Sequence, residues 1–235
     1  MSLISDWNPK QTELKTALAH QESFEEAIKL CLELHGSVHS GAVSRTALPT
    51  IFDGLWNGLS HEAFVKPPAR DDGFGRKATI AWNIWHITRI EDITANILIA
   101  DGIQILDDAW LGKLGVSVTD TGNPMSEDEI AEFSDAMKME ALLRYRNAVG
   151  TRTREIILGL SYSGCKRKMK PESVQRILAE GGVTEHKDSI WLLDFWGKKN
   201  VAGILLMPIT RHQIMHISHC FKLKNRLQFQ RNGIP

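Results

Sequence analysis

Two histidines one helical turn apart have the clearest potential for chemistry in this sequence. His212 and His216 lie four residues apart in a segment with helical periodicity, so their imidazoles share a face and could bind one ion. Gln213 stands where the HExxH motif of zinc proteases has its glutamate, so that motif and its general base are absent. The spacing also occurs on ordinary helix faces, and the pair therefore needs further support.

His86 is the candidate third ligand. It lies on an apolar stripe with Trp82 and Ile93 in another expected helix. A buried histidine taken alone more often has a hydrogen-bond partner than a metal. Two helices that each turn histidine inward can nevertheless bring the imidazoles together in a bundle core. We therefore predict one divalent-metal site formed by His86, His212 and His216.

Three further residues could support this site. His219 lies on the same side of the last helix and could be a fourth ligand or a polar group at the edge of the site. Cys220 could supply a soft ligand or be a small buried apolar residue. Glu91 falls on an apolar stripe, where it could accept a proton or hydrogen-bond to a metal ligand. It could equally form an ion pair between helices or lie at an edge of the stripe that reaches solvent.

The other five histidines are left outside the predicted site. They lie near expected helix ends, loops or charged stretches, where a solvated or capping role is ordinary. They are His20, His35, His39, His61 and His186.

The elements that must position the site are helices. The helix with His86 is expected to begin after Thr79 as N-cap and to stop at 100–102. The helix with the histidine pair is expected from about Pro208 to Gln230. Apolar spacing and stop signals predict further helices over 9–34, 48–64, 126–159 (opened by a capping box at Ser126), 171–180 and 188–196. We expect an all-α fold in one domain over 1–235: four long or moderately long helices of bundle type, with short helices in the connections.

Composition excludes several classes of function. The 28 Lys and Arg residues balance the 28 Asp and Glu residues, so no overall positive field favours nucleic acid or anionic lipid. No apolar run approaches the roughly 18 residues that span a bilayer, and the first residues lack the pattern of a signal peptide. The three cysteines are widely spaced without a CxxC pair. We expect a soluble, cytoplasmic protein without nucleic-acid or membrane partners.

Two segments resemble the DinB-like superfamily. They are TIAWNIWHITRIEDI at 79–93 and MPITRHQIMH at 207–216, and the similarity spans most of the chain. The resemblance implies a four-helix bundle with one histidine from the second core helix and an HxxxH pair from the last, which correspond here to His86, His212 and His216. It also implies homodimers. Family members studied as enzymes are transferases and isomerases that use low-molecular-weight thiols.

Two hypotheses of function remain open. In the first, three neutral histidines hold Zn²⁺ or Ni²⁺ with a position left for water or thiol, giving a metal-dependent transferase or hydrolase that acts on a small molecule. In the second, the protein is a non-catalytic bundle in which metal or a small ligand has a structural or regulatory role. A DNA-damage effector that touches DNA is suggested by the family name and opposed by the neutral charge balance.

Overall fold

The computed structural model describes residues 3–69 and 77–231, with side chains up to residue 226. Within these ranges the chain is all-helical, without β-strands and with one isolated bridge between Lys168 and Asn200. The predicted all-α class is confirmed. Among the described helices, none combines the length and the apolar character needed to cross a membrane.

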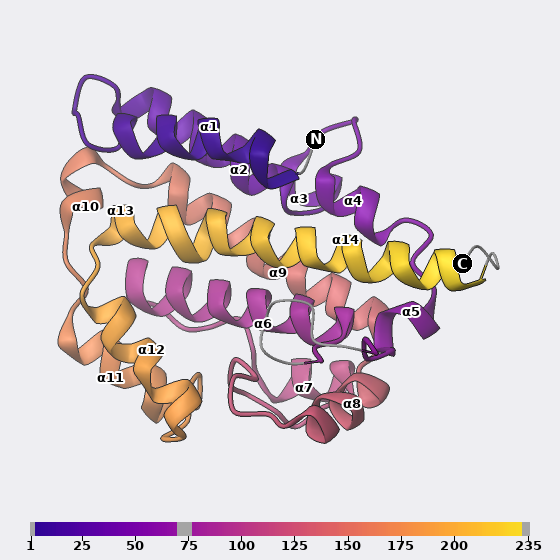
Figure 1. The fold of residues 1–235 in the computed structure, drawn as a ribbon. Coiled ribbons are helices and arrows are strands. Elements are labelled where there is room, and N and C mark those ends of the chain that lie inside the picture. Colours follow the sequence, from indigo (N-terminus) through magenta and orange to yellow (C-terminus); the bar gives the residue numbers. More distant parts are fainter. Residues whose placement is uncertain (1–2, 70–76, 232–235) are drawn as a thin grey trace.

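Four long helical segments lie side by side (Figure 1). They are α2 (Phe24–Ser37); α6 (Ile80–Asp92), which continues as the π-helical η1 (Ile93–Ile99); α9 (Met139–Leu158); and a continuous segment of α13 (Val201–Ile204), π-helical η2 (Leu205–Arg211) and α14 (His212–Arg231). Their contacts close a circuit: α2 meets α9, α9 meets α6, α6 meets α14, and η2 meets α2. Every residue of α6 and η1 is buried, which places the helix with His86 in the middle of the molecule.

Shorter helices cover the ends and sides of these four segments. A fifth helix of some length, α1 (Leu3–Ala17), packs along α2 and α14. Two further helices, α11 (Pro171–Ala179) and α12 (Lys187–Gly197), pack against each other (Figure 1), and α11 contacts η1. The remaining helices of the described chain are α3 (Gly41–Ser44), α4 (Ile51–Trp56), α5 (His61–Val65), α7 (Asp108–Leu114), α8 (Glu127–Ala136) and α10 (Tyr162–Lys166).

Several predicted boundaries are confirmed. The Thr79 hydroxyl accepts a hydrogen bond from the Trp82 amide and caps α6. Ser126 and Glu129 form the expected capping box at the start of α8. The predicted helices at 171–180 and 188–196 differ from α11 and α12 by no more than one residue at either end.

The predicted unbroken helix over 9–34 is wrong. The structure has a helical hairpin instead, in which α1 ends at Ala17 and α2 begins at Phe24. The Ser23 hydroxyl donates to the Ala17 carbonyl, 3.0 Å away, and satisfies one of the open carbonyls at the end of α1. The apolar periodicity persists across the turn because the two antiparallel helices bury their apolar faces against each other.

Two other expected helices are each interrupted. The 48–64 segment forms α4 and α5, separated at Gly58, whose positive φ of 68° is incompatible with a continuing helix. The 126–159 segment breaks at Met137, whose ψ is 119°. There the Lys138 amide donates to the Leu114 carbonyl at 2.9 Å, a tertiary hydrogen bond that replaces a helical one.

The last helical segment begins earlier than predicted. It starts at Val201, where the Asn200 side chain accepts from the Gly203 amide, rather than at Pro208. Pro208 lies inside η2, and the wider π-helical turn accommodates a residue that has no amide hydrogen to donate.

Candidate metal site

The structure brings the three predicted ligands together. His86 extends from α6, while His212 and His216 come from the first turns of α14. The nitrogens that these imidazoles could offer to a metal all lie within 4.8 Å of one another. The ring centroids are 5.1 Å apart for His86 and His212, 4.9 Å for His86 and His216, and 4.6 Å for His212 and His216. His86 and His216 are buried and His212 is half-buried.

The orientation of two of these imidazoles is set by oxygen acceptors. His86 Nδ1 lies 2.8 Å from the Thr121 carbonyl oxygen, and His216 Nδ1 lies 2.7 Å from Asn83 Oδ1. Both partners can only accept, so in each case Nδ1 carries the proton and Nε2 carries the lone pair. The Asn83 amide is itself oriented, because its Nδ2 donates to the Thr79 carbonyl at 2.7 Å. Metal-bound histidines in proteins commonly have this arrangement.

A short segment, 119–122, runs along α6 and provides four successive carbonyl acceptors. Each accepts from a side-chain N–H of α6: Thr119 from Arg89 at 2.9 Å, Asp120 from Trp85 at 3.1 Å, Thr121 from His86 at 2.8 Å and Gly122 from Trp82 at 3.1 Å. We call 119–122 the acceptor segment. The hydrogen bond to His86 is thus one of four consecutive bonds between α6 and this segment. Together they hold the Thr121 carbonyl in place and restrict rotation of the imidazole.

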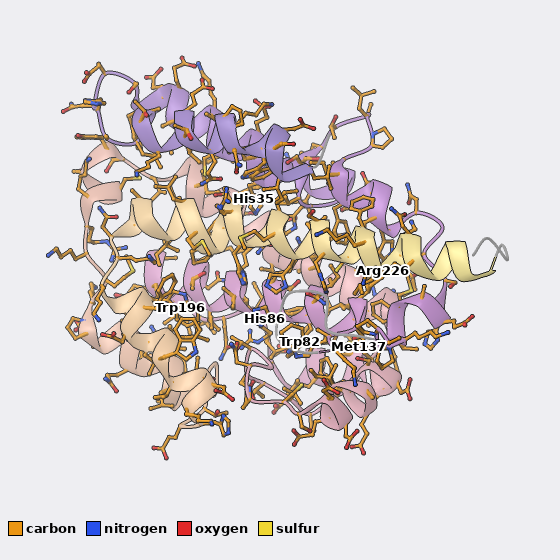
Figure 2. The ribbon with its side chains drawn as sticks, in the orientation of Figure 1. His35, Trp82, His86, Met137, Trp196 and Arg226 are labelled. Atoms are coloured by element: carbon orange, nitrogen blue, oxygen red, sulfur yellow. The ribbon has the colours of Figure 1, made fainter. Side chains whose placement is uncertain are left out.

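Trp82 closes one side of the site. Its indole stacks on the His86 imidazole, with a centroid distance of 4.7 Å and an interplanar angle of 10°. Figure 2 shows the two residues close together along α6. The neighbouring Gly122 has a positive φ of 75°, and a Cβ there would lie 2.7 Å from Trp82 Nε1. Glycine at this position allows the acceptor segment to approach the indole closely.

Burial keeps the histidine pair neutral. Desolvation, followed by the nearby His86, lowers the pKa of His212 well below its usual value. Desolvation also lowers the pKa of His216, with contributions from His212, His86 and His219. Neutral imidazole is the form that binds a metal ion. In addition, the buried Nδ1 of His212 has no hydrogen-bond partner in the structure, and a ligand bound at this nitrogen would satisfy it.

The neighbouring candidates on α14 lie outside the set of three. His219 is buried and close enough to influence His216 electrostatically, but it does not belong to the group whose donor atoms converge. Cys220 is also completely buried and does not belong to that group.

Glu91 belongs to a second buried cluster, which we call the Glu91 cluster. Its Oε1 accepts from His35 Nε2 at 2.8 Å and its Oε2 from His39 Nε2 at 2.9 Å. All three side chains are fully buried. The expectation that His35 and His39 are solvated or capping residues is wrong, because both are buried and donate hydrogen bonds to the Glu91 carboxylate. In Figure 2, His35 lies apart from His86 and Trp82, on the side of α2.

A signal for the Glu91 cluster was present in the sequence. His35 and His39 are four residues apart, the same spacing as His212 and His216. They follow Ala27, Cys31 and Leu34, which recur at helical intervals and are buried. The expected helix end near Gly36 suggested solvent exposure, whereas α2 continues to Ser37 and its end is covered by α9.

The remaining three histidines behave as expected. His20, His61 and His186 are exposed. His186 caps α12, since its Nδ1 accepts from the Asp188 amide at 3.3 Å.

The residues present fit a divalent metal at His86, His212 and His216. The donor set is three neutral imidazoles from two helices, a combination used by catalytic zinc sites that keep a position for water or substrate. The Glu91 cluster also groups three donor atoms within 4.8 Å, but both of its Nε2 atoms already donate to the carboxylate. Comparisons with protein-family models and with curated proteins gave no match to this chain.

Proposed function

We propose that this protein binds one divalent metal ion through His86, His212 and His216 and uses it in catalysis. The observation that carries the proposal is the pair of oriented imidazoles, in which the Nδ1 atoms of His86 and His216 donate to fixed oxygen acceptors. Zn²⁺ and Ni²⁺ are the best candidates, because imidazole nitrogen suits both ions.

The reaction that fits this site best is transfer or hydrolysis on a small molecule, with a low-molecular-weight thiol as a candidate co-substrate. A divalent ion supplies Lewis acidity there, lowering the pKa of a coordinated water or thiol or polarising a substrate carbonyl. The chain's own residues hold the imidazoles neutral and aligned. Gln213 offers no carboxylate, so a general base must come from elsewhere or from the coordinated group itself.

The wider identity proposed is that of a DinB-like four-helix bundle, cytoplasmic and homodimeric. The closed circuit of contacts among α2, α9, α6 and the last helical segment supports the bundle architecture. The order of one histidine on α6 and an HxxxH pair on the last segment supports the family.

Metal analysis of the purified protein tests the site. We expect about one equivalent of Zn²⁺ or Ni²⁺ in the wild type and its loss in the His86→Ala, His212→Ala and His216→Ala triple variant. His20→Ala removes an exposed histidine and serves as the control, which should retain the metal. Undiminished metal in the triple variant would contradict the assignment.

A screen for turnover tests the enzymatic part. Metal-loaded protein is assayed with thiols and a range of electrophiles, esters and amides, before and after chelation. Metal-dependent turnover that is absent from the triple variant supports the enzyme. The strong burial of His86 and His216 favours the alternative, a structural metal, which predicts lower thermal stability on chelation without any metal-dependent reaction.

A further inference from the structure

Gln213 lies between two ligands in sequence and is completely buried. Its Nε2 donates to the Ile87 carbonyl at 3.0 Å and to the Pro208 carbonyl at 3.3 Å. Ile87 directly follows His86, and Gln213 directly follows His212. One hydrogen bond therefore joins α6 to α14 beside the point where each presents a candidate ligand.

The amide of Gln213 can adopt only one orientation here. Its Oε1 accepts from Arg146 Nη2 at 2.8 Å. A guanidinium only donates and backbone carbonyls only accept, so the oxygen must face Arg146 and the nitrogen must face the two carbonyls. A glutamate at this position could accept from Arg146 but would turn a second acceptor toward the carbonyls. The three contacts therefore match an amide and not a carboxylate.

Arg146 anchors that orientation from a third helix. It is fully buried on α9, where Nη1 donates to Thr88 Oγ1 at 3.0 Å on α6 and Nη2 donates to the Val38 carbonyl at 2.8 Å at the end of α2. One guanidinium thus contacts α6, α14 and the end of α2 while extending from α9. A planar group with several donors in fixed directions can define the spacing of these elements.

The Glu91 cluster provides the compensating charge. The carboxylate of Glu91 favours the protonated form of Arg146, while burial lowers the pKa of Arg146 to about 10, which still leaves it charged at neutral pH. Burial, with help from Arg146, lowers the pKa of His39 to about 3, so His39 is a neutral donor to Glu91. A dication added at this cluster would face Arg146 across a buried region, which opposes a second metal site.

We propose that Gln213 is a positioning residue that holds His86 and His212 at metal-binding distance, with Arg146 fixing the orientation of its amide; the proposal rests on the proposed metal site. The role is distinct from catalysis, because the amide contacts backbone and Arg146 rather than any reacting atom. It predicts that metal affinity depends on the amide itself and not on general core stability.

Metal binding by position-213 variants tests this role. Gln213→Met removes both the donor and the acceptor of the amide while keeping a side chain of similar volume. Gln213→Glu keeps the acceptor but loses the donor. The matched control is Gln11→Met: Gln11 is another buried amide, which donates to the Leu206 carbonyl at 2.8 Å and accepts from Trp7 Nε1 at 2.7 Å, but it ties α1 to η2. Zn²⁺ affinity is measured by competition with a chelating dye, coordination by the Co²⁺ d–d absorption bands, and apoprotein stability by thermal unfolding.

We expect both position-213 variants to bind Zn²⁺ about 10- to 100-fold more weakly and to alter the Co²⁺ bands. Gln11→Met should lower the Tm of the apoprotein and leave affinity and bands unchanged. Wild-type affinity in both position-213 variants, or an equal loss of affinity in Gln11→Met, overturns the positioning role alone. Failure of the wild type to bind Zn²⁺ or Co²⁺ overturns the proposed site and the positioning role with it.

Discussion

At the scale of single residues, the site depends on what holds each imidazole rather than on the imidazoles alone. The backbone carbonyl of Thr121 orients His86, whereas a side-chain amide, Asn83, orients His216. Asn83 is therefore the orienting partner that mutation can remove. His212 lacks a comparable bond at Nδ1.

Asn83→Leu should weaken Zn²⁺ binding by about 10- to 100-fold, because His216 loses the acceptor that fixes its tautomer and rotation. The measurement is competition with a chelating dye. A control is Asn8→Leu, which removes a surface bond to Arg211. Equal affinity of Asn83→Leu and wild type would exclude an orienting role for this residue.

His39 should make stability fall in mild acid. Burial lowers its pKa from 6.5 to about 3 in the folded protein, so between these pH values the imidazole is protonated in the unfolded chain but neutral in the folded one. Above pH 6.5 it is neutral in both states. The free energy of unfolding therefore falls as the pH decreases from 6.5 toward 3.

Urea unfolding of wild type and His39→Gln at several pH values between 6.5 and 4 measures this effect. The free energy of unfolding of the wild type should fall more steeply, by about 1.4 kcal/mol per pH unit. Glutamine keeps a donor for Glu91 but does not titrate, so an overall loss of stability in the variant does not disturb the comparison of slopes. Parallel pH dependences would contradict the prediction.

The three cysteines should be unreactive in the folded state. Each is a buried free thiol, and burial raises the pKa of Cys31 to about 12 and that of Cys165 to about 11. Thiolate, the reactive form, is therefore scarce at pH 8. Alkylation followed by mass spectrometry should label none of the three in native protein and all three in denaturant. Rapid native labelling of Cys31 would show that α2 opens readily.

At the scale of elements, the acceptor segment 119–122 contributes to the geometry of the candidate metal site together with the helices that carry the three histidines. It has no regular secondary structure, yet its carbonyls set the register of four side chains on α6. A substitution that shifts the backbone of this segment should therefore disturb the orientation of His86, although it replaces none of the three candidate ligands.

Gly122→Ala tests this connection against Gly58→Ala. Both glycines have positive φ, but a Cβ at Gly58 has nothing within 4 Å, whereas one at Gly122 meets the Trp82 indole. Gly58→Ala should cost about 1–2 kcal/mol of unfolding free energy from backbone strain, and Gly122→Ala a further 1–3 kcal/mol or so from the clash. Only Gly122→Ala should also weaken Zn²⁺ binding. Urea unfolding and dye competition provide the two readouts, and identical behaviour of the variants would contradict the account.

At the scale of the whole molecule, a metal at this site would join α6 and α14, two helices far apart in sequence. Because only the folded chain assembles the three ligands, binding adds to stability by mass action, about 2.7 kcal/mol at a free concentration 100-fold above Kd. Thermal unfolding should show a higher Tm with Zn²⁺ and a return to the lower value on chelation. The triple histidine variant should show no shift; an equal shift in that variant would locate the stabilising metal elsewhere.

Local signals in the sequence determined much of this protein. The all-α class, the caps at Thr79 and Ser126, and the inward faces of the segments bearing His86, His212 and His216 follow from periodicity and capping chemistry, which act within a few residues. The single domain, the homodimer, the family and the bound metal stay predictions.

Only the tertiary structure decided where helices break and which buried polar groups meet. The turn between α1 and α2 keeps the apolar period, and the break at Met137 depends on a bond from Lys138 to Leu114, so neither could be derived from spacing. The partners of Glu91 lie more than 50 residues away, at His35 and His39. Burial of such groups depends on long-range packing, because only packing determines which acceptor a buried donor finds. The same holds for the three histidines: the sequence determined their faces, and the contact between α6 and α14 brought them together.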